Sequence, residues 1–279
     1  MPLTGFLSHN SEQKKPYFAT IYIGSKIMPI NNPLKEVEKV LQSAPVGEKT
    51  DDVAFLKKYI GTQYNIIGLS IPYHRALSKK AYSFSSLKPE EQIKIWDGIW
   101  QQSTLHDSMT QAVLFWEKNI EKMDPKLAWN CLKGWTGKID NWAHSDGLSG
   151  LYSYLLEIIP ETVLPQLKKW NASKNPWERR QSVVGLIHYH SKRNKVLPYP
   201  TLIPFVENLL DDKDYFVQKG VGWALREIGN IYHKETFSFL KKNYAKITST
   251  AFAAASEKLN TKEKEGLKTL RKAARKKSN

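Results

Sequence analysis

The sequence is short of cysteine, of acidic side chains and of long apolar runs, and each shortage excludes a class of protein. Cys131 is the only cysteine among 279 residues, so the chain can form no internal disulfide and no cysteine-based metal site. No apolar run approaches the roughly 18 residues of a membrane-spanning helix. Gly-rich phosphate loops, Gly-x-Ser-x-Gly and His-Glu-x-x-His are also missing, which argues against most nucleotide-dependent, serine-hydrolase and zinc-protease activities. We expect a cytoplasmic protein, in a reducing compartment, with no metal, cofactor, nucleotide or membrane partner.

The surplus is in positive charge. Lys and Arg total 42 against 27 Asp and Glu, which gives a net charge of +15 and a pI near 9.6. This balance favours a polyanionic partner, either nucleic acid or an acidic membrane surface. The alternative is a cationic surface that only aids solubility.

Residues 1–31 fit no helical pattern and are treated as an N-terminal arm. They lack the basic region and apolar run of a signal peptide. The segment 17–23 has the β-branched and aromatic content of a short strand, but we identify no partner strand in the rest of the chain. The arm is therefore expected to be extended or disordered.

Residues 32–260 read as a series of helices joined by short connections. Prolines that open helices, acidic first turns and apolar residues at helical spacing recur along this stretch. Pro160 ends one helix, and Ile93, Trp96, Gly98 and Trp100 mark the buried side of another. Helices are expected near residues 33–41, 53–60, 106–120, 142–158, 165–170, 201–211, 214–229, 234–244 and 249–258, and further helices are expected to start at Pro89, at Asp124-Pro125 and at Asn175-Pro176.

Three of these segments recur at a nearly constant interval. Trp142 and Arg180 are 38 residues apart, and Arg180 and Trp223 are 43 apart. Helical segments that recur at about 40 residues indicate HEAT-like repeats, and equivalent positions in such repeats line one side of the array. The sequence therefore predicts an all-α fold, a HEAT-like helical-repeat solenoid (an α-α superhelix) with a basic concave face.

Residues 261–279 form a basic C-terminal helix or tail. Eight Lys or Arg stand against two Glu in 262–277, and Leu267, Leu270 and Ala274 have helical spacing. Two interpretations stay open: a solvated terminal helix, or a basic tail that binds phosphate.

Asp146 and Trp142 are the first candidates for a functional site. Their four-residue spacing places a carboxylate and an indole on one face of a helix. The plainer interpretation is that Asp146 serves the helix N-terminus and that Trp142 and Trp223 are core residues. Arg180, close to a helix start, is a candidate phosphate contact or the partner of a carboxylate. Lys219, four residues before Trp223, is a further candidate phosphate contact or a solvated lysine.

These segments resemble the DNA alkylation repair enzyme family, whose type member, AlkD, is a bacterial HEAT-repeat alkylpurine DNA glycosylase. The resemblance runs from about Val53 to Ala245, and its most specific part is the stretch 215–227, Tyr-Phe-Val-Gln-Lys-Gly-Val-Gly-Trp-Ala-Leu-Arg-Glu. The catalytic aspartate of the family, four residues after a tryptophan, matches Asp146 and Trp142. Its second cleft tryptophan matches Trp223.

The resemblance also implies DNA contacts, an activity and a partner. The DNA-contacting arginine of the family matches Arg180, and a tyrosine ahead of a Gly-x-x-x-Pro loop matches Tyr59, before Gly68 and Pro72. The implied protein is a monofunctional glycosylase, expected as a monomer, that removes cationic alkylated purines from double-stranded DNA. Such an enzyme leaves the lesion stacked.

The sequence departs from the family pattern near Asp146 and leaves two alternatives open. The segment Asn141-Trp142-Ala143 stands where the family often has paired tryptophans followed by an acid, and Ala-His-Ser separates Trp142 from Asp146. The alternatives are a non-catalytic HEAT-repeat DNA-binding relative and a HEAT-type protein–protein scaffold. Retention of the site residues argues against the first, and the +15 charge argues against the second.

Overall fold

The computed structural model describes residues 20–23, 26–29 and 32–278. Two strands come first, β1 (Thr20–Ile23) and β2 (Lys26–Pro29). The helices are α1 (Pro33–Gln42), α2 (Val53–Ile60), α3 (Ile71–Leu77), α4 (Pro89–Gln102), α5 (His106–Asn119), α6 (Pro125–Leu132), α7 (Trp142–Ile158), α8 (Pro160–Asn171), α9 (Pro176–Val184), α10 (Tyr199–Glu207), α11 (Tyr215–Gly229), α12 (His233–Asn243), α13 (Ser249–Ala255) and α14 (Thr261–Ser278). Short 3-10 turns lie at Val46–Glu48, Ile120–Lys122, Trp135–Lys138 and His190–Lys192.

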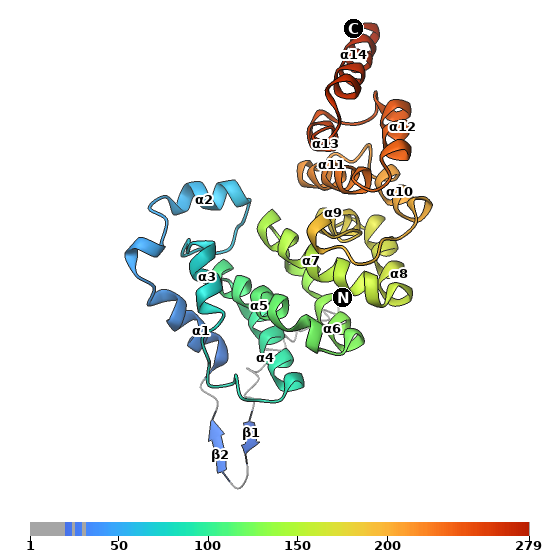
Figure 1. Cartoon of the computed structure of the whole chain (residues 1–279). Coiled ribbons are helices and arrows are strands. Elements are labelled where there is room, and N and C mark those ends of the chain that lie inside the picture. Colours follow the sequence, from blue (N-terminus) through green and yellow to red (C-terminus); the bar gives the residue numbers. More distant parts are fainter. Residues whose placement is uncertain (1–19, 24–25, 30–31, 279) are drawn as a thin grey trace, which may run out of the picture.

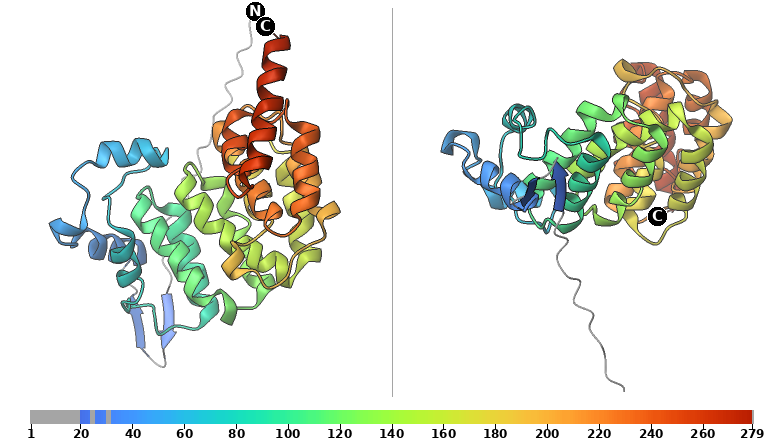
Figure 2. Two further views of the ribbon diagram at one scale, coloured as in Figure 1. Left: turned by 45° about the horizontal axis from the view of Figure 1, so that its top comes forward. Right: turned by 90° about the horizontal axis from the view of Figure 1, so that it is seen from below.

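The helices follow one another around an arc, which confirms the predicted helical-repeat array. In Figure 1, α8, α10 and α12 form one layer and α7, α9, α11 and α13 the other. The arc opens between α2 at one end and α14 at the other (Figure 2, left). Within the described residues, no helix is long and apolar enough to cross a membrane.

Short polar side chains begin most of these helices. The side chain of each cap accepts a hydrogen bond from a backbone N–H of the first turn, which satisfies one of the free donors there. The capping residues are Asn32, Asp52, Ser70, Asp124, Asn141, Asn175, Asp214 and Thr248. Gly61 ends α2 in the left-handed region at φ 78°, where a side chain is disfavoured.

One continuous apolar core runs along the arc. Six of the nine tryptophans are buried in it: Trp96, Trp100, Trp116, Trp129, Trp135 and Trp170. Trp142, Trp177 and Trp223 are only partly buried, and they lie on α7, α9 and α11. The tryptophans that the core does not enclose are therefore on successive helices of one layer.

We call α7, α9, α11 and α13 the inner layer; its helices run parallel and pack tightly, as α11 and α13 show. The cap of α13, Thr248, donates to Gln218 near the start of α11 (2.8 Å), and Arg226 near the end of α11 pairs with Glu257 after α13 (2.6 Å). At Gly222 an added Cβ would lie 2.4 Å from the Ala251 carbonyl oxygen, so α11 and α13 could not pack this closely with a larger residue there. The N-terminal ends of α7, α9, α11 and α13 consequently lie along one edge.

The structure corrects three sequence expectations. The strand in the arm does have a partner, because β1 pairs antiparallel with β2, Thr20 opposite Pro29 and Ile23 opposite Lys26. Pro160 begins α8 as well as ending α7, and Pro165 lies inside α8. Ile99, not Gly98, completes the buried side of α4. The rest of the 1–31 arm lies outside the described residues.

Candidate functional site

The N-terminal ends of α7, α9 and α11 bring Asp146 and Arg180 into direct contact. Arg180 is 5% exposed, and its Nη2 donates to Asp146 Oδ1 at 2.5 Å. Its Nε donates to Ser145 Oγ (2.9 Å) and its Nη1 to the Phe216 carbonyl (2.7 Å). One guanidinium therefore joins three inner helices and fixes the carboxylate.

Asp146 remains open on its other side. Its side chain is 40% exposed although its partner is 7% exposed. Within residues 32–278, Oδ1 receives the Arg180 bond, and no hydrogen bond reaches Oδ2. The site thus offers one accessible carboxylate oxygen, held in place by a buried cation.

Trp142 is held against the end of α2. Its indole Nε1 donates to the Tyr59 carbonyl (2.9 Å), and the two rings meet edge to face with centroids 5.4 Å apart. Tyr59 also stacks on Phe55, and both rings are more than half exposed. Neither ring of the Tyr59–Trp142 pair belongs to the core, so both remain at least partly open to solvent.

Polar contacts fix α2 in that position. Asp140, directly before α7, accepts from Thr62 Oγ1 and from the Gln63 backbone N–H, both at 2.7 Å. The hydroxyl of Tyr64 donates to the Lys138 carbonyl (2.8 Å). Gly61 lies so close to Phe216 of α11 that an added Cβ would approach the ring to 3.0 Å. The end of α2 therefore reaches across the inner edge from α7 to α11.

Trp223 reaches the site through a residue that the sequence patterns did not indicate. Its ring meets Tyr189 edge to face at 5.2 Å. Burial raises the pKa of Tyr189, and the nearby Asp146 charge raises it further. Both effects favour the protonated phenol over the phenolate.

Lys219 lies on the rim. It is exposed, and its Nζ lies 5.8 Å from the centroid of the Tyr215 ring. Phe216, next to Tyr215, stacks on Trp177 at 5.1 Å. Phe216 was within the quoted 215–227 stretch but was not singled out, and Tyr189 gave no spacing signal because it lies past the end of α9.

Two of the three residues between Trp142 and Asp146, His144 and Ser145, are turned into the protein. His144 is buried and stacks on His106 with centroids 4.1 Å apart. Ser145 is fully buried and accepts from Arg180. The bulk and polarity of His144 and Ser145 therefore lie behind the site, and the unusual Ala-His-Ser segment does not narrow its opening.

Arg180 differs most from its sequence interpretation. It was predicted to contact DNA, with a carboxylate partner as the alternative. In the structure it has that partner, and three of its five N–H groups are bonded within the protein. A phosphate contact would use the remaining two and stays a prediction. Among the residues that the structure describes, no three His, Cys, Asp or Glu side chains are grouped as a metal site.

Comparison with known proteins decides the family. The sequence profile described as DNA alkylation repair enzyme matches residues 47–259, which is most of the chain and includes every residue of the site above. The chain belongs to the DNA alkylation repair enzyme family. Helix α14 and the two N-terminal strands lie outside the matched residues.

Solved structures of similar fold support the helical architecture of this family. A predicted DNA alkylation repair enzyme from Enterococcus faecalis superposes with a TM-score of 0.64, at 18% identity over 77% of this chain and 98% of its own. AlkD2 from Streptococcus mutans superposes with a TM-score of 0.50, at 21% identity over 75% of this chain and 98% of its own. No curated protein matches the chain significantly. At these identities the likeness concerns the fold.

Proposed function

We propose that this protein is a monofunctional DNA glycosylase that hydrolyses the N-glycosidic bond of cationic alkylated purines, of the 3-methyladenine and 7-methylguanine type, in duplex DNA. Membership of the DNA alkylation repair enzyme family supports the repair role. The observation that carries the specific activity is Asp146: one carboxylate oxygen is fixed by buried Arg180, and the side chain remains 40% exposed.

The chemistry of the lesion matches a site with a single carboxylate. A purine alkylated at N3 or N7 is already cationic, so the electron pair of the breaking C1′–N bond neutralises it and the base leaves without a general acid. The sugar becomes an oxocarbenium-like cation, which the open oxygen of Asp146 would stabilise electrostatically. Water then adds to C1′ and loses a proton, to Asp146 or to solvent. No step needs a metal or a nucleotide.

The surrounding rings suit this cation. Trp142 and Trp223 are partly buried on α7 and α11, on either side of the α9 arginine. An indole face close to a developing positive charge adds about 0.5–2 kcal/mol of cation–π stabilisation. Tyr59 and Lys219, both exposed, are the proposed contacts with the DNA backbone.

Binding should depend strongly on salt if this surface receives duplex DNA. Each phosphate neutralised by Lys or Arg contributes a slope of about −0.9 to log K against log salt. Affinity for duplex DNA that is unchanged between about 50 and 200 mM salt would contradict a phosphate-binding surface.

The test is release of free base from duplex DNA containing 7-methylguanine, by the wild type, by Asp146→Asn and by Asp211→Asn. Asp211 is an exposed aspartate outside the site, so its change is the matched control. We expect release by the wild type and the control, and a loss of at least about 100-fold, or about 2.7 kcal/mol of barrier, in Asp146→Asn.

Each other outcome selects a different function. Binding without release by the wild type would indicate a non-catalytic DNA-binding relative. A wild type that neither binds duplex nor releases base would favour a protein–protein scaffold. Equal release by all three proteins would mean that a different carboxylate acts.

A further inference from the structure

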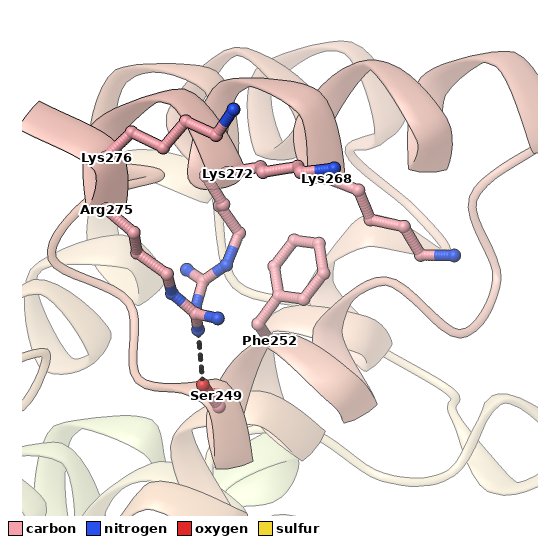
Figure 3. Close-up of a pocket in the computed structure, with 7 residues that line it drawn as sticks. Ser249, Phe252, Lys268, Lys272, Arg275 and Lys276 are labelled. Atoms are coloured by element: carbon pink, nitrogen blue, oxygen red, sulfur yellow. Dashed lines mark hydrogen bonds between the residues drawn. The ribbon is translucent and has the colours of Figure 1, made fainter.

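Helix α14 carries a cationic surface that the site at Asp146 does not use. A cavity of about 460 Å³ lies between α13 and α14, and its lining is five basic residues, one serine and one phenylalanine: Ser249, Phe252, Lys268, Arg271, Lys272, Arg275 and Lys276. Figure 3 shows Arg275 reaching from α14 to Ser249, while Lys268, Lys272 and Lys276 leave the same helix and end away from Phe252 and Ser249. We call these seven residues the α13–α14 surface.

The surface is built on a rigid base. Arg271 is 9% exposed and donates to the carbonyls of Tyr244 and Ile247, both at 2.6 Å. Its guanidinium lies over the Phe252 ring at 4.4 Å. Arg271 thus fastens α14 to α13 and to the segment before it, and the helix carries the other four cations on its exposed side.

Most of those remaining cations have no acidic partner. Lys268 pairs with exposed Glu265, and Arg275 donates to Ser249 Oγ at 2.8 Å. Among the side chains that the structure describes, Lys272, Arg275 and Lys276 have no carboxylate within ion-pair distance. Positive charges gathered this closely repel one another, so the surface is complementary to an anion with several charges.

The direction of α14 places these charges on the edge where the site lies. The helix runs back along α13, and Arg275 reaches Ser249, the first residue of α13. The N-terminal end of α13 continues the line of N-terminal ends of α7, α9 and α11 that carries Asp146, Arg180 and Lys219. A rod-shaped polyanion following that edge would meet both places.

The spacing along the edge predicts where on the rod α14 would bind. Three helix-to-helix steps separate α7 from α13, and each packed pair is about 8–10 Å apart, which gives about 24–30 Å. At about 3.4 Å per base pair, this distance is about seven to nine base pairs. The spacing suits duplex DNA, whereas a free nucleotide or a single phosphate would not span it.

We propose that the α13–α14 surface binds backbone phosphates of the duplex about seven to nine base pairs to one side of the base facing Asp146. This extends the proposed function, because it takes duplex DNA as the ligand. It also assigns a role to a helix that lies outside the residues matched by the family profile. The ammonium groups of Lys272 and Lys276 bind the phosphates, and Arg271 anchors the helix that bears them.

The test compares the full-length wild type with Lys272→Gln/Lys276→Gln and with Lys168→Gln/Lys169→Gln. All four lysines are exposed, and the second pair, on the outer helix α8, removes the same charge away from the inner edge. Binding is measured by fluorescence anisotropy from 50 to 200 mM salt on two series of lesion duplexes. The long duplex has twelve base pairs on each side of the lesion. In the two short duplexes, one side or the other is reduced to four base pairs.

We expect the α14 pair to lose affinity for the long duplex and the salt slope to fall in magnitude by about 1.8, two contacts at about 0.9 each. The α8 pair should match the wild type. Shortening one side of the duplex should weaken the wild type and abolish the difference between it and the α14 pair. The rate of base release at saturating protein should be unchanged in both variants.

Other results overturn the proposal in distinguishable ways. Equal affinity and slope in the wild type and the α14 pair, with base release intact, would contradict the α14 contact alone. Duplex binding that depends on the α14 pair, without base release, would sustain the contact and contradict the glycosylase. Binding to phosphatidylserine vesicles in place of duplex would assign the surface to a membrane.

Discussion

The inner edge of the protein has two cationic regions that differ in what accompanies the charge. At the α7–α9–α11 ends, the central cation is the buried Arg180, and its charge is paired with a carboxylate that remains 40% exposed. At the α13–α14 surface, five basic residues line the cavity and no acidic residue does. The first region is arranged around a carboxylate, and the second is the one that we propose binds phosphate.

The presence of a carboxylate in only one region suggests different roles for the two regions, one in the reaction and one in DNA binding. A cation-stabilising carboxylate is useful only where positive charge develops during the reaction, whereas unpaired Lys and Arg favour any phosphate. The partly buried tryptophans follow the same division, because Trp142, Trp177 and Trp223 lie on α7, α9 and α11, and α13 and α14 carry none. We therefore assign chemistry to the first region and binding to the second.

Among the residues that support Asp146, the largest expected effect comes from removing the Arg180 cation. Arg180→Met leaves Asp146 without its fixed partner and the Phe216 carbonyl without its donor. We expect a loss of about 2–4 kcal/mol in the free energy of unfolding, from urea titration, and a 10- to 100-fold slower base release by the folded protein.

Arg179→Met is the matched control, because Arg179 makes a similar pair with Asp212. It should lose comparable stability and keep the release rate. If the two variants release base equally well, Arg180 has no special part in positioning Asp146, and the division between the regions fails.

A second effect concerns pH and the core behind the first region. Burial lowers the pKa of His106 to about 4, and Asp107 offsets this only partly. The unfolded state then takes up a proton first, near pH 6.5, so stability is full above that pH and falls as pH drops toward 4. His106 alone should cost the fold about 2 kcal/mol between pH 7 and pH 5.

Urea unfolding at both pH values, on the wild type and on His106→Leu, measures this contribution as a difference of differences. Burial acts on the pKa of both His144 and Asp107, and the charge of His106 lowers both, so the difference reports His106 together with its coupling to these two groups. The α13–α14 surface has no histidine or acid, so α14-dependent duplex affinity should change little over the same range. An identical loss of stability in the two proteins would contradict the assignment to His106.

A smaller effect is expected from the aromatic rings. Trp142→Leu removes an indole face and its bond to the Tyr59 carbonyl. The release rate at saturation should fall about 2- to 30-fold, which corresponds to about 0.5–2 kcal/mol. Phe252→Leu removes the ring under Arg271 in the second region and should leave that rate unchanged. An equal fall in the release rate of both variants would contradict a specific role for the Trp142 ring.

The smallest effect is expected at Tyr189. Tyr189→Phe keeps the edge contact with Trp223 and removes only the hydroxyl. Losing one hydrogen-bond donor costs about 0.5–1.5 kcal/mol, so the release rate should fall about 2- to 10-fold. Tyr215→Phe, at an exposed ring on the rim, should have no effect on the rate. A larger fall in the release rate of Tyr189→Phe would indicate that the hydroxyl takes a direct part in the reaction.

Local signals in the sequence account for most of the fold. Asp52, Asp124 and Asn175 cap helices as their residue types predict, and Gly61 ends α2. The missed pairing of β1 with β2 did have a local signal, because Gly24-Ser25 is a turn-favouring pair between two short strands. Such signals are readable because they act between residues close in the chain.

For the same reason, the sequence predicted only the part of the site that lies on one helix. Trp142 and Asp146 share a helix, so their common face follows from spacing. The bond of Arg180 to Asp146 spans 34 residues, and that of Trp142 to Tyr59 spans 83. Whether Arg180 is exposed to phosphate or buried depends on how α7 and α11 pack around it. Tyr189, outside any regular helix, has no period that could predict its place.

The rate of base release reports most directly where in the protein the chemistry occurs. The decisive measurement is the single-turnover rate of base release from 7-methylguanine duplex at saturating protein, for Asp146→Asn and for Lys272→Gln/Lys276→Gln beside the wild type. We predict a fall of at least about 100-fold in the first and less than about 2-fold change in the second. A rate that survives in Asp146→Asn, or that collapses in the lysine variant, would contradict the separation of reaction from binding.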